Sequence, residues 1–209
     1  MNKAPSPPND YRYRQGYEPH TNRILMPHLL RYARMINAGS AIDIGCGNGT
    51  TLRDLSPVCS QLVGIDPSES GIEEAKKNCP SAKFYTLGVY DSPDLIAESG
   101  FDLAIATEVV EHLFRPRELL RLAHNKLRKG GLLVLSTPYH GWLKNVAISA
   151  LNKWDCHHTV FWDGGHIKFW SRATLGKLLE EEGFDIVGFH GCGRAPYLWA
   201  SMVMGGMKK

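Results

Sequence analysis

The chain has 209 residues, 43% of them hydrophobic, and a formal net charge of +3 at pH 7. These values suit one domain with a buried core, and the scattered lysines and arginines do not favour nucleic-acid binding. Five cysteines without a CxxC pair indicate reduced thiols and a cytoplasmic protein. No apolar run resembles a signal peptide or reaches the roughly 18 residues of a membrane span.

Helix-like and strand-like segments alternate after a polar, proline-rich tail over residues 1–23. Apolar residues at helical spacing predict a helix over 24–36, and the first expected strand is 41–44. The later segments continue the alternation, with helices over 49–55, 68–78, 116–127 and 171–182 and strands over 61–65, 83–87, 101–106, 132–136 and 184–189. We expect the strand over 132–136 to start from a turn at Gly130–Gly131, and Ser68 to cap the helix that follows it. The pattern predicts an α/β fold, a doubly wound and mostly parallel sheet with helices on both faces, as a single domain over 24–209.

Residues 138–168 interrupt this alternation and form a candidate insert that covers the substrate. Within it, apolar residues follow a helical stripe at positions 142, 143, 146, 147, 150 and 151. Packing into the core is the default interpretation of such a stripe. The alternative is a lid over an aromatic or lipidic acceptor, touching a membrane surface as an interfacial helix, with only Lys144 and Lys153 to meet anionic head groups.

Three alternating glycines, Gly45, Gly47 and Gly49, follow the first strand and indicate a cofactor loop, because a side chain there would obstruct a bound ligand. A dinucleotide-binding G-x-G-x-x-G loop would need glycine at position 50, where the chain has Thr50. Asp43, two residues before the loop, would repel a pyrophosphate and suits a cofactor that carries an ammonium group. A nicotinamide oxidoreductase is therefore disfavoured.

The segment Asp43-Ile-Gly-Cys-Gly-Asn-Gly49 resembles the first motif of class I S-adenosylmethionine-dependent methyltransferases, and the resemblance extends over about residues 24 to 190. It implies their Rossmann-like seven-stranded sheet, with Asp66 accepting hydrogen bonds from both ribose hydroxyls. The segment 88–91 stands where that family recognises adenine, with Asp91 as a substitute for its usual acid, and 101–107 ends beside the methionine part. The implied cofactor-binding residues are Asp43, Gly45, Cys46, Gly47, Asp66, Pro67, Val89, Tyr90 and Thr107.

Cys46 is expected to fill space in the loop and is assigned no chemistry. The N-terminal residues 11–17 have two interpretations, a solvated tail or a cap over the cofactor in which Arg12 or Arg14 pairs with its carboxylate.

Three polar residues, Glu108, Glu111 and His112, follow the fourth expected strand at spacing i, i+3 and i+4. If this segment is helical, they share one face at the carboxyl edge of the sheet, where such folds bind ligands. Two carboxylates and an imidazole suit Mg²⁺, Mn²⁺ or Zn²⁺, which would lower the pKa of a bound hydroxyl. Two alternatives stay open: His112 acts as a general base without metal, with Glu111 beside it, or the residues have a structural role.

The same Glu-x-x-Glu-His segment resembles the O-methyltransferases of ubiquinone biosynthesis and the small-RNA terminal 2'-O-methyltransferases. In both groups these positions are associated with a metal near the accepting oxygen, and the RNA group implies His166 as a fourth ligand. His140, His157 and His158 are left open between surface and site.

These features together predict an O-methyltransferase that uses S-adenosylmethionine, releases S-adenosylhomocysteine and acts on a small-molecule hydroxyl, quinol-like, phenol-like or lipidic. The alternatives are a non-catalytic S-adenosylmethionine-binding regulator and methylation of an RNA ribose or another acceptor. The sequence specifies neither the acceptor nor the oligomeric state.

Overall fold

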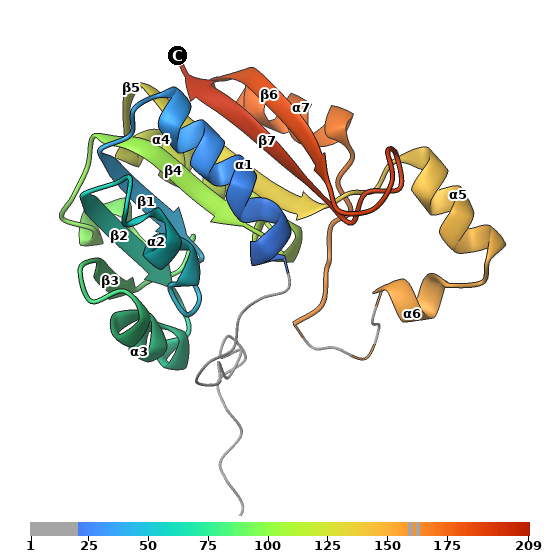
Figure 1. Ribbon diagram of the computed structural model, residues 1–209, viewed down its shortest axis with the longest axis horizontal. Helices are drawn as coiled ribbons and strands as arrows, with labels where there is room; N and C mark the ends of the chain where they lie inside the picture. Colours follow the sequence, from blue (N-terminus) through green and yellow to red (C-terminus); the bar gives the residue numbers. More distant parts are fainter. Residues whose placement is uncertain (1–20, 159–160, 162–163) are drawn as a thin grey trace, which may run out of the picture.

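The computed structural model describes residues 21–158, 161 and 164–209, so the expectations for residues 11–17 lie outside the described residues. A seven-stranded sheet in the order β3-β2-β1-β4-β5-β7-β6 forms its centre (Figure 1). The strands are β1 (Ser40–Ile44), β2 (Gln61–Asp66), β3 (Lys83–Thr86), β4 (Phe101–Thr107), β5 (Leu127–Pro138), β6 (Phe184–Cys192) and β7 (Ser201–Lys208). β7 runs antiparallel to both β5 and β6, and all other strand pairs are parallel. The predicted doubly wound, mostly parallel sheet is therefore confirmed.

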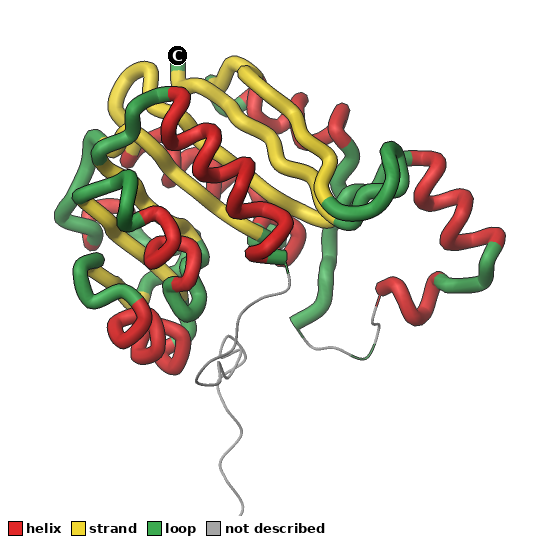
Figure 2. The backbone as a smooth tube through the Cα atoms, in the orientation of Figure 1, coloured by secondary structure: helices red, strands yellow, loops and turns green. Residues whose placement is uncertain are grey.

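Helices cover both faces of this sheet (Figure 2). The helical segments are α1 (Asn22–Met35), α2 (Thr50–Leu55), α3 (Glu69–Asn78), η1 (Pro93–Leu95), η2 (Val110–His112), α4 (Pro116–Lys126), α5 (Trp142–Ala150), α6 (Trp154–His158) and α7 (Arg172–Glu181). The side chains of α1, α2 and α3 pack in one apolar cluster, and those of α4 and α7 pack in another. Strand β4 separates the two clusters, because its successive side chains point to opposite faces. Leu103 and Ile105 belong to the first cluster, and Ala104 and Ala106 belong to the second.

The order of the strands reverses at β1, which lies between β2 and β4. The carboxyl ends of β1, β2 and β4 therefore meet at one edge, on either side of the crevice where open α/β sheets bind ligands. The loops after β1, β2 and β4 carry most of the residues that the sequence singles out.

Two boundaries differ from the sequence-based expectation. β5 begins at Leu127, and the expected turn at Gly130–Gly131 lies inside this strand. Gly130 has a φ of +69°, and the pairing with β4 shifts register between Phe101 and Leu103, which marks a bulge. β7 was not predicted as a strand, because two glycines and three methionines in 201–208 obscure the alternation of apolar and polar residues. The predicted N-cap is confirmed, since the Ser68 hydroxyl accepts from the backbone N–H of Gly71 at 3.1 Å.

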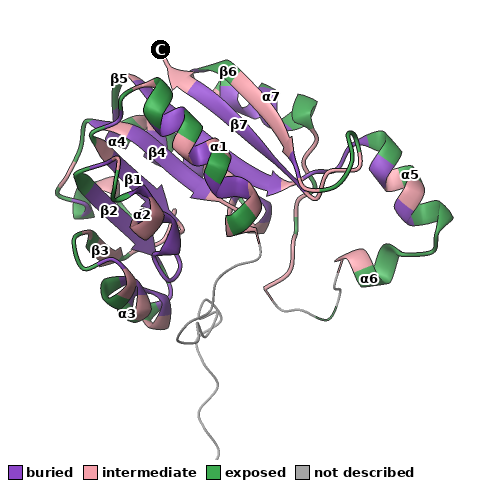
Figure 3. Ribbon diagram, in the orientation of Figure 1, coloured by how far each residue is buried: buried purple, intermediate pink, exposed green. Residues whose placement is uncertain are grey.

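The predicted insert contains an arm, α5 and α6, that projects from the edge of the sheet (Figure 1). The expectation that the apolar stripe of α5 packs into the core is wrong, because much of this helix is exposed (Figure 3). Trp142 is 75% exposed and Val146 is 55% exposed. The buried side chains of this helix are Lys144 and Ile148, one turn apart on another face. Helix α5 contacts the rest of the chain along the face of Lys144 and Ile148, because it packs beside the sheet and not on one of its faces. In the described part of the chain, no helix is long and apolar enough to cross a membrane.

The exposure of α5 predicts how substitutions there affect stability. Trp142→Ser should change the free energy of unfolding by less than about 0.5 kcal/mol, because a surface side chain loses little packing. Ile148→Ala, the matched substitution on the buried face, should cost about 2 kcal/mol. Urea unfolding followed by far-UV circular dichroism measures both, and an equal loss in the two variants would restore the core interpretation.

Candidate functional site

The glycine loop after β1 passes directly under the loop that follows β4. Gly45, Gly47 and Gly49 have φ values of +81°, +51° and +75°, a region that side chains disfavour. A Cβ on Gly45 would lie 2.5 Å from Cγ2 of Val109, and a Cβ on Gly49 would lie 2.9 Å from the Cα of Ala75. These glycines thus permit both the turn and the close packing of the two loops.

Asp66, at the end of β2, fixes the shape of this loop. Its carboxylate accepts from the backbone N–H of Gly47 at 2.9 Å and from that of Ser68 at 2.8 Å. Both bonds hold the carboxylate at the carboxyl end of β2, beside the glycine loop. Asp66 therefore has the position that its predicted role requires, and the role itself stays a prediction.

Asp43 is a fully buried carboxylate whose two oxygens have no hydrogen-bond partner. Burial, and next the charge of Asp66, raise its pKa to about 8. A buried carboxylate without a donor costs free energy, and a ligand ammonium group beside it would supply the missing charge and hydrogen bonds. This unpaired group fits the predicted cofactor with its amino group.

Cys46 behaves as a packing residue in this structure. Its thiol is buried, and burial raises its pKa well above the usual value, which disfavours a reactive thiolate. Its sulfur would lie 2.8 Å from a Cβ on Gly64, so the side chain fills the space that this glycine leaves.

The expected adenine segment lies in the turn after β3. Val89 is half-buried, and Tyr90 is exposed with its ring under the guanidinium of Arg115. Asp91 accepts from the backbone N–H of Gly88 at 2.7 Å, so part of its carboxylate closes the turn. Pro67 is exposed on the neighbouring loop after β2. None of these contacts tests the predicted recognition of adenine.

Glu108 departs from the expected helical arrangement. It follows Thr107, the half-buried last residue of β4, and has a φ of +54°, so the segment does not start as a helix there. Its carboxylate accepts from the hydroxyls of Ser136 at 2.9 Å and Ser201 at 3.4 Å. Burial raises its pKa to about 7, against the opposing effects of these hydroxyls and of Lys144. Helical geometry is present only over Val110–His112, and Glu108 therefore does not join the other two residues as the spacing suggested.

The structure instead brings His166 to Glu111 and His112. The Nε2 atoms of His112 and His166 each lie 4.0 Å from Oε1 of Glu111, and the two rings are 4.9 Å apart between centroids. One ligand atom from each residue lies within 4.8 Å of the others, so the group could hold a metal ion. The backbone N–H groups of Ile167 and Lys168 donate to the carbonyl of Glu111, both at 3.0 Å, which holds the segment of His166 in place.

Glu111 is the most strongly perturbed group of this cluster. It is 1% exposed, neither of its oxygens has a hydrogen-bond partner, and burial followed by the charge of Glu108 raises its pKa well above the usual value. Burial lowers the pKa of His112 and lowers that of His166 to about 4, so both imidazoles are neutral near pH 7. A cation bound between Glu111 and the two imidazoles would lower the pKa of Glu111 instead of raising it.

Several residues near the site were not assigned to it from the sequence. His140, left open between surface and site, is buried, and its ring lies 5.6 Å from that of His157 and 5.7 Å from that of His158. Lys144 is 3% exposed and donates to the carbonyl of Ala200 at 3.3 Å. One signal for Lys144 was present in the sequence, a charged residue between apolar positions of the stripe over 142–151.

Comparison with known proteins agrees with this geometry. Residues 17–188 match the family described as methyltransferase domain. The chain belongs to this family. It carries a methyltransferase domain of the class that uses S-adenosylmethionine.

Two relatives are named ubiquinone biosynthesis O-methyltransferase. That of Nitrobacter winogradskyi is 29% identical over 177 residues, covering 80% of this chain and 66% of the relative. That of Ruegeria pomeroyi is 27% identical over 164 residues, covering 76% of this chain and 64% of the relative. The chain thus spans just under two thirds of the length of these two relatives.

Among solved structures, the methyltransferase domain of a bacterial Hen1 protein superposes with a TM-score of 0.65 at 22% identity. The match covers 90% of this chain and 99% of that domain. At this identity the likeness shows the fold alone.

The unpaired carboxylate of Asp43 predicts a pH-dependent difference in stability. Because the pKa of the folded protein, about 8, is above the ordinary value of 3.8, the folded state binds more protons than the unfolded state between these pH values. Stability from this group therefore falls as pH rises through that window. Asp43→Asn should unfold at a higher temperature than the natural protein near pH 8, and the advantage should vanish near pH 4.

Thermal unfolding across this pH range, without cofactor, measures the effect. The same variant should bind S-adenosylmethionine more weakly, because it lacks the charge that the cofactor's ammonium group would meet. Asp54→Asn, at a half-buried residue of α2, is the control for removal of a carboxylate. Parallel stability curves for the natural protein and Asp43→Asn would contradict the inferred burial cost.

Proposed function

We propose that this methyltransferase transfers the methyl group of S-adenosylmethionine to a hydroxyl oxygen of a small-molecule acceptor, beside Glu111, His112 and His166. The observation that carries the proposal is the convergence of a buried carboxylate and two neutral imidazoles next to the end of β4. Such groups can accept the proton of a hydroxyl or bind a cation that favours its ionised form. The names of the ubiquinone-biosynthesis relatives support oxygen as the accepting atom.

The chain orients His112 for proton transfer. Nδ1 of His112 lies 3.3 Å from the carbonyl oxygen of Gly165, which requires the hydrogen on Nδ1 for a hydrogen bond. That tautomer leaves a lone pair on Nε2, the atom that faces Glu111. His112 would then take the acceptor's proton at Nε2 as the oxygen bonds to the methyl carbon, and the carbon–sulfur bond would break to release S-adenosylhomocysteine. Glu111 would stabilise the imidazolium that forms.

The same three residues fit a divalent cation. The unpaired, buried oxygens of Glu111 need a positive charge, and both imidazole Nε2 atoms point to one of them. The present spacing is wider than the roughly 3.3 Å between ligands that share one ion, so the side chains would move closer to bind it. Two imidazoles and one carboxylate favour Zn²⁺ or Mn²⁺ over Mg²⁺, which prefers oxygen ligands. A bound ion would lower the pKa of the acceptor's hydroxyl.

His112→Ala should lower methyl transfer by about 10²- to 10⁴-fold, because the proton acceptor is lost, and leave cofactor affinity unchanged. His124→Gln, in the last turn of α4 beside Phe184, is the matched control and should retain activity. Transfer of labelled methyl groups measures turnover, and calorimetry with S-adenosylhomocysteine measures affinity. Full turnover in His112→Ala would exclude this assignment.

Metal binding distinguishes a metal site at Glu111, His112 and His166 from a general base at His112 that acts without metal. If the cluster is a metal site, calorimetric titration of Zn²⁺ and Mn²⁺ into protein saturated with S-adenosylhomocysteine should show one ion per chain. Glu111→Gln and His166→Ala should each abolish that binding, because both remove a ligand. Absence of binding in the natural protein would leave His112 as a base that acts without metal.

A further inference from the structure

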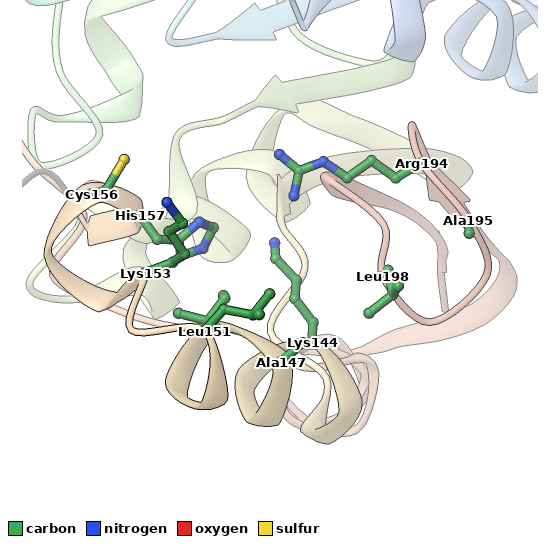
Figure 4. Close-up of a pocket in the computed structure, with 10 residues that line it drawn as sticks. Lys144, Ala147, Leu151, Lys153, Cys156, His157, Arg194, Ala195 and Leu198 are labelled. Carbon is green, nitrogen blue, oxygen red and sulfur yellow. The ribbon is translucent and has the colours of Figure 1, made fainter.

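A cavity of about 470 Å³ lies between the arm and the loop that joins β6 to β7 (Figure 4). Its volume is in the range of small-molecule sites. Helices α5 and α6 form one side, and the loop residues Arg194, Ala195 and Leu198 form the other. The insert and the loop between β6 and β7 therefore form this cavity together.

The basic side chains in this cavity come from both of its sides. Lys144, Lys153 and His157 belong to the arm or its connecting turn, and Arg194 lies across from them (Figure 4). None of the described residues that line the cavity is acidic. Arg194 contributes to the lowered pKa of both Lys144, about 8, and His157, about 4, although burial is the larger cause for each. A bound anion would relieve this repulsion among the cations of the cavity.

The remaining wall of the cavity is mainly apolar. Ile148 and Leu151 line the arm side, and Leu198 lines the loop side. Water-exposed apolar surface beside a cluster of cations suits a ligand with an anionic end and an apolar body. Inorganic ions would leave this surface without a partner.

Lys144 links the cavity to the proposed site of methyl transfer. Its ammonium group donates to the carbonyl of Ala200 at 3.3 Å, and the hydroxyl of the next residue, Ser201, donates to the carboxylate of Glu108 at 3.4 Å. Glu108 directly follows β4 and precedes Glu111 and His112 in the same loop. A ligand held at Lys144 therefore lies near the loop that carries Glu111 and His112.

We propose that this cavity binds an amphipathic acid, a carboxylate or phosphate on an apolar skeleton, and that the methyl acceptor is of this class. Lys144, Lys153 and Arg194 bind the anionic end, and Ile148, Leu151 and Leu198 contact the apolar body. The assignment of the methyl acceptor to this class rests on the proposed function. Binding of an amphipathic acid in the cavity does not, and it is tested separately.

Binding is tested with octanoate, octyl phosphate and the neutral octanamide, titrated by calorimetry into the full chain saturated with S-adenosylhomocysteine. At least one of the two anions should bind about tenfold or more tightly than octanamide, and the stronger of them identifies the preferred anionic group. The double variant Lys153→Gln/Arg194→Gln should lose this preference. The double variant Lys129→Gln/Arg34→Gln removes the same charges at exposed positions outside the cavity and should retain it.

Equal affinity for octanamide and the anions, or no anion binding up to about 10 mM, would overturn the cavity assignment. Tighter binding of the anions than of octanamide in Lys153→Gln/Arg194→Gln would also overturn the cavity assignment. Binding of S-adenosylhomocysteine serves as the internal check that each variant is folded. These results do not depend on methyl transfer.

The acceptor class is tested with labelled S-adenosylmethionine and a low-molecular-weight filtrate of extract from the source cells. Labelled product that an anion exchanger retains, reduced tenfold or more in Lys153→Gln/Arg194→Gln, supports the proposal. Label in neutral products, or in a macromolecular fraction tested in parallel, contradicts the acceptor class while leaving methyl transfer intact. No labelled product from any fraction contradicts the proposed function itself.

Discussion

The close contact between the loop after β1 and the loop after β4 is the constraint on which the site depends. Val109 would collide with any Cβ on Gly45, so the two loops reach this separation only with glycine. The contact places the cofactor loop against the residues that precede Glu111 and His112. Neighbouring parallel strands at the reversal of strand order supply the framework, because their carboxyl ends open on the same crevice.

Two buried carboxylates without partners stand on either side of this contact. Asp43 and Glu111 both have raised pKa values, and burial is the larger cause for each. A protein built for stability alone would pair or replace such groups, since each unpaired buried oxygen disfavours folding. Their positions make sense if ligands supply the missing positive charge, an ammonium group at Asp43 and an imidazolium or metal ion at Glu111. Stability and ligand binding are thus opposed at the same residues.

The arm presents two different faces. Its outward face carries exposed apolar side chains such as Trp142 and Val146, while Lys144 turns inward to the cavity. The framework supplies the glycine loop and the buried carboxylates of Asp43 and Asp66 at one edge of the sheet. In our proposal, acceptor selection depends instead on side chains of α5, α6 and the loop after β6.

The sequence by itself determined the alternation of strands and helices, the glycine loop and the position of Asp66, because periodicity and glycine are local signals. It also placed Glu111 and His112 at the correct edge. The resemblance to the small-RNA methyltransferases implied His166 as a ligand, and the structure brings it to Glu111 across 55 positions. Only the tertiary structure turned Glu108 toward Ser136 and Ser201, since a left-handed residue leaves no local pattern. The tertiary structure also decided that the apolar stripe of α5 is exposed to solvent. Periodicity identifies an apolar face of a helix without identifying what that face contacts.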